Sequence, residues 1–216
     1  MRSMLVIGLG RFGSNLAVKL MELGNEVMAV DRDEEIVDSL ASSVTCAQIG
    51  DCMEEKVLRS LGVANFDICF VCISGNFQSS LEITSLLKEL GAKRVVSKTN
   101  REMHAKFLLK VGADEIVYPE RDMALRTAFK YSARGAFDYV ELSKEYAIIE
   151  MEVPSTWIGG SLKELNVRSR HHINVIGAKS GNDVVPITSP DYVFKEGEHL
   201  IVAGEKRNLL NLADGH

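Results

Sequence analysis

The chain has 216 residues, of which 46% are hydrophobic and 25% charged, a balance typical of a soluble globular protein. Its formal net charge of −5 argues against nucleic acid and anionic membrane surfaces as general partners, and no apolar run approaches the roughly 20 residues that cross a bilayer. The N-terminal residues pass directly into a strand-like segment with no signal-peptide pattern, so we expect a cytoplasmic protein without direct membrane insertion.

Strand-like and helix-like segments alternate through the first 120 residues. The strand-like segments are short apolar runs at residues 3–10, 26–31, 44–51, 66–74, 93–100 and 114–120. The helix-like segments between them lie at residues 12–23, 33–42, 53–62, 76–91 and 101–111. Because most of the strands lack polar alternation, we expect helices on both faces of their sheet. The order predicts an α/β fold with a doubly wound, parallel, Rossmann-like sheet over residues 1–120.

The pattern changes after residue 120. The stretch “RDMALRTAFKYSARGAF” predicts a helix over residues 121–137 that no matching strand follows at once, and we assign residues 121–136 to a linking helix. Residues 137–216 contain short strand-like runs, Gly and Pro turns, and one short helix near residues 161–165. They predict a small, β-rich domain of the α+β class.

Cys69 and Cys72 have the C-x-x-C spacing that can mark a metal or redox site. Both lie in a strand-like run, in which residues three apart point to opposite faces of the sheet, so the two thiols cannot easily hold one ion. We therefore predict that these cysteines are structural.

The segment Gly8-Leu9-Gly10-Arg11-Phe12-Gly13 matches G-x-G-x-x-G between a predicted strand and a predicted helix. Gly8 permits a tight turn, Gly10 lets the backbone approach a phosphate, and Gly13 lets the helix pack closely on the strand. Asp31 ends the second strand, eighteen residues beyond Gly13, where such folds bind ribose hydroxyls. The pattern predicts a nucleotide site. The carboxylate disfavours the 2′-phosphate of NADP, although Arg32 beside it weakens that exclusion.

Other polar residues follow the remaining strands at the same edge of the sheet, where α/β folds bind ligands. Arg11 and Lys98 could neutralise phosphates, whereas Glu120 could meet a phosphate only through a cation, which favours a polyphosphate with a divalent metal. For Asn76, capping of the next helix explains the residue as well as binding does. The residues of this group are Asp51, Ser74, Gly75, Asn76, Lys98 and Glu120.

The sequence contains no recognisable catalytic machinery. His171, His172 and His199 lie in turn-like segments with no obvious partner, and no nucleophile motif, P-loop or zinc spacing is present. We therefore favour a nucleotide-binding protein that is not an enzyme. An NAD-dependent oxidoreductase with a reduced substrate domain is the alternative, and a generic assembly or ligand-binding module is a third possibility.

Five stretches across the chain carry a family resemblance: “VIGLGRFGSNLA”, “VMAVDRDEE”, “IGDC”, “YPERDMA” and “VFKEGEHLIVAGE”. They resemble the RCK family, which joins a TrkA-N domain to a TrkA-C domain, and within it the cytosolic regulatory subunits of Ktr/Trk-type bacterial potassium uptake systems. The resemblance implies that ATP, ADP or NAD(H) changes the shape of a gating ring and so gates a membrane potassium channel or transporter. Such subunits pair through the crossover helix and assemble into octameric rings at the inner face of the plasma membrane.

The resemblance also implies a set of binding residues. It assigns the terminal phosphates to Arg11 and a divalent cation, Mg²⁺ or Ca²⁺, to Glu120. In several relatives the C-terminal regulatory domain binds cyclic di-AMP across its dimer interface, and Arg168, Asn174 and Pro190 lie where that pocket would be. The residues that would line the nucleotide site by similarity are Gly8, Gly10, Arg11, Phe12, Gly13, Asp31, Arg32, Asp51, Cys52, Ser74 and Lys98.

Overall fold

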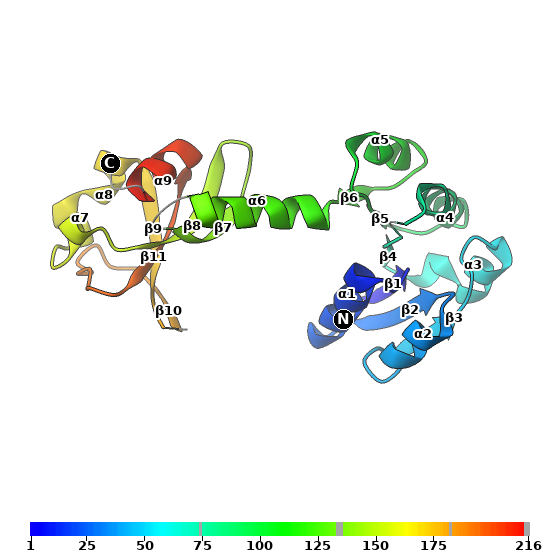
Figure 1. The fold of residues 1–216 in the computed structure, drawn as a ribbon. Helices are drawn as coiled ribbons and strands as arrows, with labels where there is room; N and C mark the ends of the chain where they lie inside the picture. Colours follow the sequence, from blue (N-terminus) through cyan, green and yellow to red (C-terminus); the bar gives the residue numbers. More distant parts are fainter. Residues whose placement is uncertain (74, 133–135, 182, 214–216) are drawn as a thin grey trace. The chain divides into compact units, whose positions relative to one another are not determined.

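A computed structural model describes residues 1–73, 75–132, 136–181 and 183–213 (Figure 1). The chain divides into two compact units, with the boundary between Arg121 and Asp122. Within the described ranges, none of the helices combines the length and the apolar character that a membrane span requires.

The first unit is built on a parallel six-stranded sheet with the order β3-β2-β1-β4-β5-β6 (Figure 1). This order reverses between β1 and β4, as in doubly wound nucleotide-binding folds, and it confirms the predicted fold class. The strands are β1 (Ser3–Ile7), β2 (Glu26–Asp31), β3 (Cys46–Ile49), β4 (Ile68–Val71), β5 (Val95–Lys98) and β6 (Glu115–Val117). The helices are α1 (Arg11–Glu22), α2 (Glu34–Leu40), α3 (Glu55–Leu61), α4 (Phe77–Glu89), α5 (Glu102–Lys110) and the short 3₁₀ helix Val63–Asn65.

Two apolar layers cover the sheet of the first unit. Leu5 of β1 belongs to the layer that contains buried residues of α3 and α4, and its neighbour Val6 belongs to the layer with α1 and α2. Both faces of the sheet are therefore buried, as the apolar strands predicted. Cys69 lies in the first layer and Cys72 in the second, so the two thiols occupy opposite faces. Burial raises the pKa of each thiol to about 12, which keeps both protonated at neutral pH.

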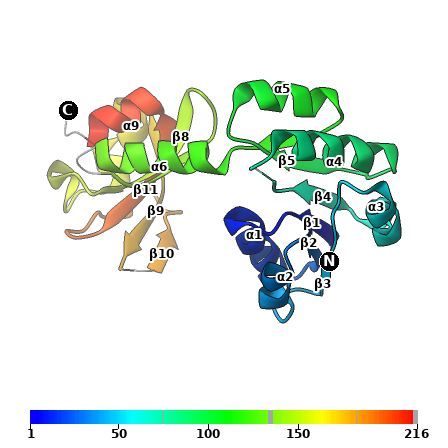
Figure 2. The same cartoon turned by 45° about the vertical axis from the view of Figure 1, so that its right-hand side comes forward.

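The second unit contains an antiparallel five-stranded sheet with the order β10-β9-β11-β8-β7. Its strands are β7 (Ala136–Glu141), β8 (Tyr146–Glu152), β9 (Ile173–Ser180), β10 (Asp183–Pro186) and β11 (His199–Glu205). Helices α7 (Leu162–Leu165), α8 (Val167–His171), α9 (Lys206–Ala213) and the 3₁₀ helix Ser155–Trp157 complete this unit. Helix α9 covers one face of the sheet (Figure 2), where its Leu209 packs with Ile149, Leu200 and the rings of Trp157 and Phe194. This arrangement confirms the α+β prediction.

Helix α6 (Pro119–Ser132) differs from the helix predicted over residues 121–137. It begins two residues earlier because Pro119 suits the first turn of a helix, where its missing N–H has no intrahelical partner to lose. The predicted end is wrong as well, because Ala136 and Phe137 belong to β7, so a strand does follow closely. No residue of α6 is buried.

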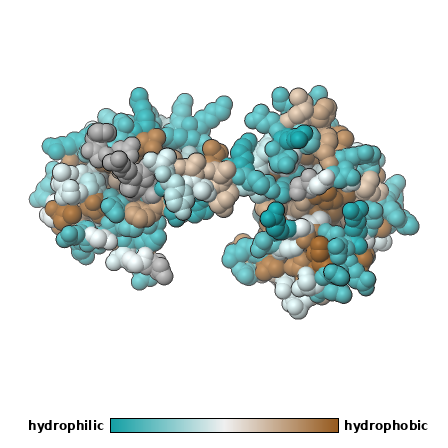
Figure 3. Space-filling view, in the orientation of Figure 1, coloured by the Kyte–Doolittle hydropathy of each residue, from teal (hydrophilic) through white to brown (hydrophobic). Residues whose placement is uncertain are grey.

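The visible surface of both units is mostly hydrophilic, with apolar residues in small groups (Figure 3). Helix α6 carries three of the exposed apolar side chains, which are Met123 at 58%, Leu125 at 47% and Tyr131 at 80% exposure.

Candidate nucleotide site

The glycine-rich turn joins β1 to α1 at the carboxyl edge of the parallel sheet. Gly8 has a φ of +88°, a conformation that side-chain-bearing residues rarely adopt. A Cβ at Gly13 would lie 1.9 Å from the Gly8 carbonyl oxygen, so the close approach of α1 to the turn requires glycine there. A Cβ at Gly10 would have no neighbour within 4 Å. Gly10 is the N-cap of α1 and has no side chain to cap the first turn, which favours an anionic group there.

Asp31 lies at the end of β2, beside the glycine turn. Its Oδ2 accepts a hydrogen bond from the Leu9 backbone N–H at 2.6 Å, and its Oδ1 accepts one from the Asp33 N–H at 3.1 Å. The carboxylate therefore holds the turn in place, a role that the sequence motif alone did not indicate. Each carboxylate oxygen can accept more than one hydrogen bond, so Asp31 keeps acceptor capacity for a ribose hydroxyl.

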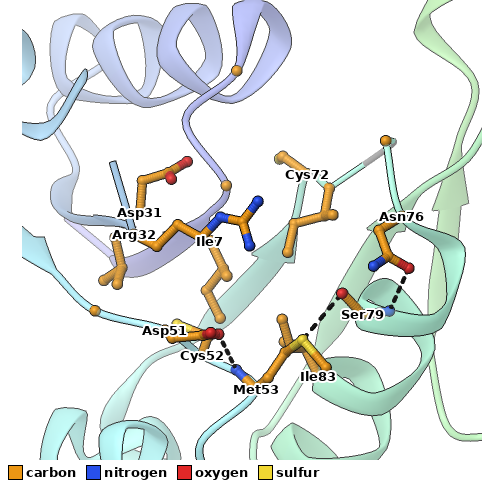
Figure 4. Close-up of a pocket in the computed structure, with 16 residues that line it drawn as sticks. Ile7, Asp31, Arg32, Asp51, Cys52, Met53, Cys72, Asn76, Ser79 and Ile83 are labelled. Carbon is orange, nitrogen blue, oxygen red and sulfur yellow. Dashed lines mark hydrogen bonds between the residues drawn. The ribbon is translucent and has the colours of Figure 1, made fainter. Parts of the chain in front are cut away.

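A cavity of about 450 Å³ opens at this edge of the sheet (Figure 4). Figure 4 shows Asp31 and Arg32 on one side of it and Asn76 and Ser79 on the other. Eight of the predicted site residues line this cavity, namely Gly8, Gly10, Asp31, Arg32, Asp51, Cys52, Gly75 and Asn76. The lining residues that the sequence did not predict are Ile7, Val30, Gly50, Met53, Cys72, Ile73, Ser79 and Ile83.

Most of the unpredicted residues give the cavity apolar walls suited to a purine ring. They carry no motif that distinguishes them from ordinary core residues. Met53 also bridges the cavity, because its Sδ accepts a hydrogen bond from Ser79 Oγ at 3.1 Å while its N–H donates to Asp51 Oδ1 at 2.9 Å (Figure 4). The thiol of Cys52 stays protonated, because burial and then the charges of Asp51 and Asp31 raise its pKa to about 12.

Asn76 acts as a helix cap in the structure. Its Oδ1 accepts a hydrogen bond from the Ser79 N–H at 3.3 Å at the start of α4. The capping explanation therefore holds, and Figure 4 shows the amide nitrogen of Asn76 on the cavity side, where it can donate a hydrogen bond. Ser74, also predicted in this loop, lies outside the described residues.

The remaining predicted nucleotide-site residues that the structure describes are not in the cavity lining, and they are Arg11, Phe12, Gly13, Lys98 and Glu120. Lys98 Nζ is 2.8 Å from Glu120 Oε1 and 5.5 Å from the centre of the Phe12 ring. The hydrogen bond from Lys98 is the main cause that lowers the pKa of Glu120, and the charge of Arg11 adds to it. Three charged side chains thus gather where β5, α1 and α6 meet.

The family resemblance implies a divalent cation at Glu120. Among the described residues, no group of three or more His, Cys, Asp or Glu side chains could hold a metal ion. Glu120 offers one carboxylate, whereas Mg²⁺ and Ca²⁺ take six or more oxygen ligands. The residues therefore fit a cation only if phosphate oxygens and water complete its coordination.

The residues predicted to bind cyclic di-AMP lie in the second unit. Arg168 is on α8, Asn174 on β9 and Pro190 in the loop that precedes β11, and all three are exposed. A cavity of about 550 Å³ in this unit is lined by other residues, from β8, the turn before β11, and α9.

His199 does have partners, contrary to the sequence prediction. It begins β11, its Nδ1 lies 2.8 Å from Glu150 Oε1, and its ring stacks on Phe137 with 4.0 Å between centroids. The prediction failed because Glu150 is 49 residues away in the chain and becomes a neighbour only through strand pairing.

Two domain families match the chain. The TrkA-N domain matches residues 4–119 and the TrkA-C domain matches residues 146–214. Ktr system potassium uptake protein C of Bacillus subtilis (strain 168) is 42% identical over 199 residues, which cover 92% of this chain and 90% of that protein. Ktr system potassium uptake protein A of the same bacterium is 37% identical over 204 residues, covering 94% and 92%.

Among solved structures, the GsuK channel bound to NAD resembles this chain with a TM-score of 0.68 and 19% identity. The match covers 100% of this chain and 40% of that channel chain. At this identity the likeness shows the fold, and this chain spans less than half the length of the channel.

Proposed function

The chain belongs to the family that joins a TrkA-N domain to a TrkA-C domain, and on that premise we propose that it is a nucleotide-sensing regulatory subunit of a Ktr-type potassium uptake system. Two relatives named as potassium uptake proteins match it over more than nine tenths of its length, which supports this assignment. In the proposal, the subunit works in the cytoplasm, beneath a membrane potassium channel or transporter, and does not act as an enzyme.

One observation carries the proposal: the glycine turn, held by Asp31, opens on a cavity of a size that small-molecule ligands occupy. We assign the ribose to Asp31 and the phosphates to Gly10 and the first turn of α1. Arg11 and Lys98 supply positive charge for the phosphates. ATP, ADP and NAD(H) share this adenosine diphosphate part, and the NAD-bound channel of the same fold supports such a ligand.

A divalent cation belongs to the same proposal. Glu120 would hold Mg²⁺ or Ca²⁺ together with oxygens of a bound polyphosphate, since its single carboxylate cannot complete the coordination alone. The cation would supply charge that neutralises the phosphates. Its binding would therefore depend on the nucleotide.

The subunit is proposed to act as a homo-oligomer that pairs through α6 and assembles into an octameric ring. In this proposal a second copy of the chain covers the exposed Met123, Leu125 and Tyr131 of α6. A nucleotide gates transport in this scheme only by binding one shape of the ring more tightly, and a difference of about 1–3 kcal/mol is typical.

The second unit is proposed to bind cyclic di-AMP through Arg168, Asn174 and Pro190 contributed by two copies. The Arg168 guanidinium suits a phosphodiester, and Asn174 offers an amide for the base or sugar. Titration of the full-length protein with cyclic di-AMP, with R168A as the variant and R170A as its neighbouring control, tests this assignment.

Calorimetric titration with ATP, ADP, NAD and NADP tests the main proposal. We expect D31A to weaken adenine nucleotide binding by about tenfold or more, because it removes a charged acceptor, while D38A on the exposed side of α2 has no effect. Light scattering should show an oligomer. Absence of binding to every adenine nucleotide contradicts the proposal, and steady consumption of NAD with reduction of a metabolite favours the oxidoreductase alternative.

A further inference from the structure

We propose that Lys98 exchanges anionic partners: it releases Glu120 and binds a phosphate oxygen when a nucleotide polyphosphate enters the site, and the exchange frees the first turn of α6. This inference rests on the proposed function, because the anion is a phosphate of the sensed nucleotide. It adds a route by which the arrival of a phosphate reaches the helix that leads out of the first unit.

The first support is the unequal burial of the two partners. The side chain of Lys98 is 6% exposed, whereas that of Glu120 is 62% exposed, and their charged atoms are 2.8 Å apart. A nearly buried ammonium group requires anionic or hydrogen-bonding partners, since the loss of such a partner is expensive away from water. A carboxylate that is mostly in water can leave at small cost. A new acceptor beside Lys98 therefore favours opening of the pair.

The second support is the position of Lys98 beside the predicted phosphate site. Its Nζ lies over the ring of Phe12, the second residue of α1, at 5.5 Å from the ring centre. Arg11, the first residue of α1, acts on the same Glu120 carboxylate through its charge. A polyphosphate bound at the start of α1 would therefore compete with Glu120 for both cations.

The third support is a small hollow next to Lys98. It measures about 10 Å³, which is room for roughly one water-sized group, and Ser80, Thr99 and Asn100 supply polar groups to its wall. Ser80 Oγ is buried and has no hydrogen-bond partner among the described residues. Ile73 lines both this hollow and the larger cavity, so the two are adjacent. A phosphate oxygen placed there would accept hydrogen bonds from both Ser80 and Lys98.

The consequence lies in α6. Glu120 is the second residue of this helix, and its bond to Lys98 ties the first helical turn to the end of β5. α6 continues to Ser132, past the boundary of the first unit. Exchange of the Lys98 partner thus removes one tie at the start of the helix. A ligand without phosphates leaves that tie intact.

A double-mutant cycle in the presence of EDTA tests the exchange. Affinities of the full chain for ATP and for adenosine are measured in the wild type, E120Q, K98M and the double variant, with K98Q as a substitute if K98M does not fold. We expect E120Q to tighten ATP binding by about tenfold, since ATP then gains Lys98 without breaking a charge-assisted hydrogen bond. Adenosine binding should not change. E115Q removes one negative charge at the amino end of β6, away from the carboxyl edge where the nucleotide is proposed to bind, and it should have no effect.

Two measurements distinguish an exchange of the Lys98 partner from simple repulsion between Glu120 and the phosphates. If E120Q tightens ATP binding equally in the wild-type and K98M backgrounds, Glu120 merely repels phosphate and the exchange is refuted. In addition, hydrogen exchange at residues 119–125 should speed up when ATP binds to the wild type and should already be fast in E120Q. Failure of the wild type to bind ATP at all overturns the proposed function instead.

Discussion

The close contact between α1 and the glycine turn makes Gly13→Ala a stringent test of the site. The new Cβ would lie 1.9 Å from the Gly8 carbonyl oxygen and 3.2 Å from Cys72 Cβ, and Cβ contacts below 3.0 Å are essentially never found. Because the closest atom belongs to the backbone, α1 or the turn has to move by more than 1 Å, the difference between 1.9 and 3.0 Å. Overpacking of this kind costs about 1–3 kcal/mol, and we expect the upper end or more.

Urea unfolding measures this cost in the two units separately. Far-UV circular dichroism follows the whole chain, whereas Trp157, the single tryptophan, is buried in the second unit and reports on that unit alone. Gly13→Ala should destabilise the first unit and leave the midpoint of the Trp157 transition unchanged. Nucleotide affinity should fall with it, since the turn that presents Gly10 is displaced.

Gly10→Ala is the matched control. Gly10 has a φ of −61°, which alanine adopts readily, and its Cβ would meet no atom within 4 Å. Stability should therefore stay within about 0.5 kcal/mol of the wild type, while the methyl group obstructs phosphate and weakens ATP binding. A Gly13→Ala protein as stable as the wild type would refute the packing argument. Unchanged ATP affinity in Gly10→Ala would refute the phosphate assignment.

Three further outcomes follow from single side chains. Burial raises the pKa of Glu150, but hydrogen bonds from Lys179 and His199 outweigh this effect and hold the pKa below 4.5. The second unit should therefore lose stability as the pH falls below 4.5. In E150Q, Trp157 fluorescence should show a smaller loss of stability over the same pH range. Cys46 is exposed, whereas the other three cysteines are buried and burial raises the pKa of their thiols to about 12. A disulfide reagent should therefore label one of the four thiols rapidly in the folded protein. Rapid labelling of two thiols would contradict this prediction. S80A should not lower stability, because Ser80 Oγ lacks a described partner, yet it should weaken binding of ATP and not of adenosine, with S85A as the control.

Local patterns in the sequence were sufficient to predict the fold of the first unit. The glycine spacing, the apolar strands and the position of Asp31 together follow a recurring strand–helix–strand pattern, and the structure shows the sheet they predicted. The same patterns placed Asp51 and Asn76 at the cavity, because the carboxyl ends of parallel strands meet at one edge. The sequence pattern could not reveal that the Asp31 carboxylate accepts a hydrogen bond from the Leu9 N–H. An acidic residue at this position gives the same pattern whether or not it makes that bond.

The contacts that two individual side chains make across the sheets could not be predicted from the sequence. Lys98 was predicted to neutralise phosphates and Glu120 to hold a metal ion, each without the other. Their pairing depends on β5 lying beside β6. The partner of His199 depends likewise on β11 lying beside β8. Each such pair joins residues more than twenty positions apart, and only the order of strands in the sheet brings them together.

The two halves of the candidate site differ in how much a ligand can change them, and this difference bears on signalling. Asp31 already holds the glycine turn through the Leu9 N–H, so adenosine bound as proposed would meet a preformed surface and its binding energy would not be needed to order the turn. In the proposal, the phosphate half contains the Lys98–Glu120 bond, which a bound polyphosphate would replace. A ligand shifts a conformational equilibrium only through a difference in its affinity for the two states. In the proposed mechanism that difference arises at the phosphates, so adenosine should compete with ATP for the site without changing hydrogen exchange in α6.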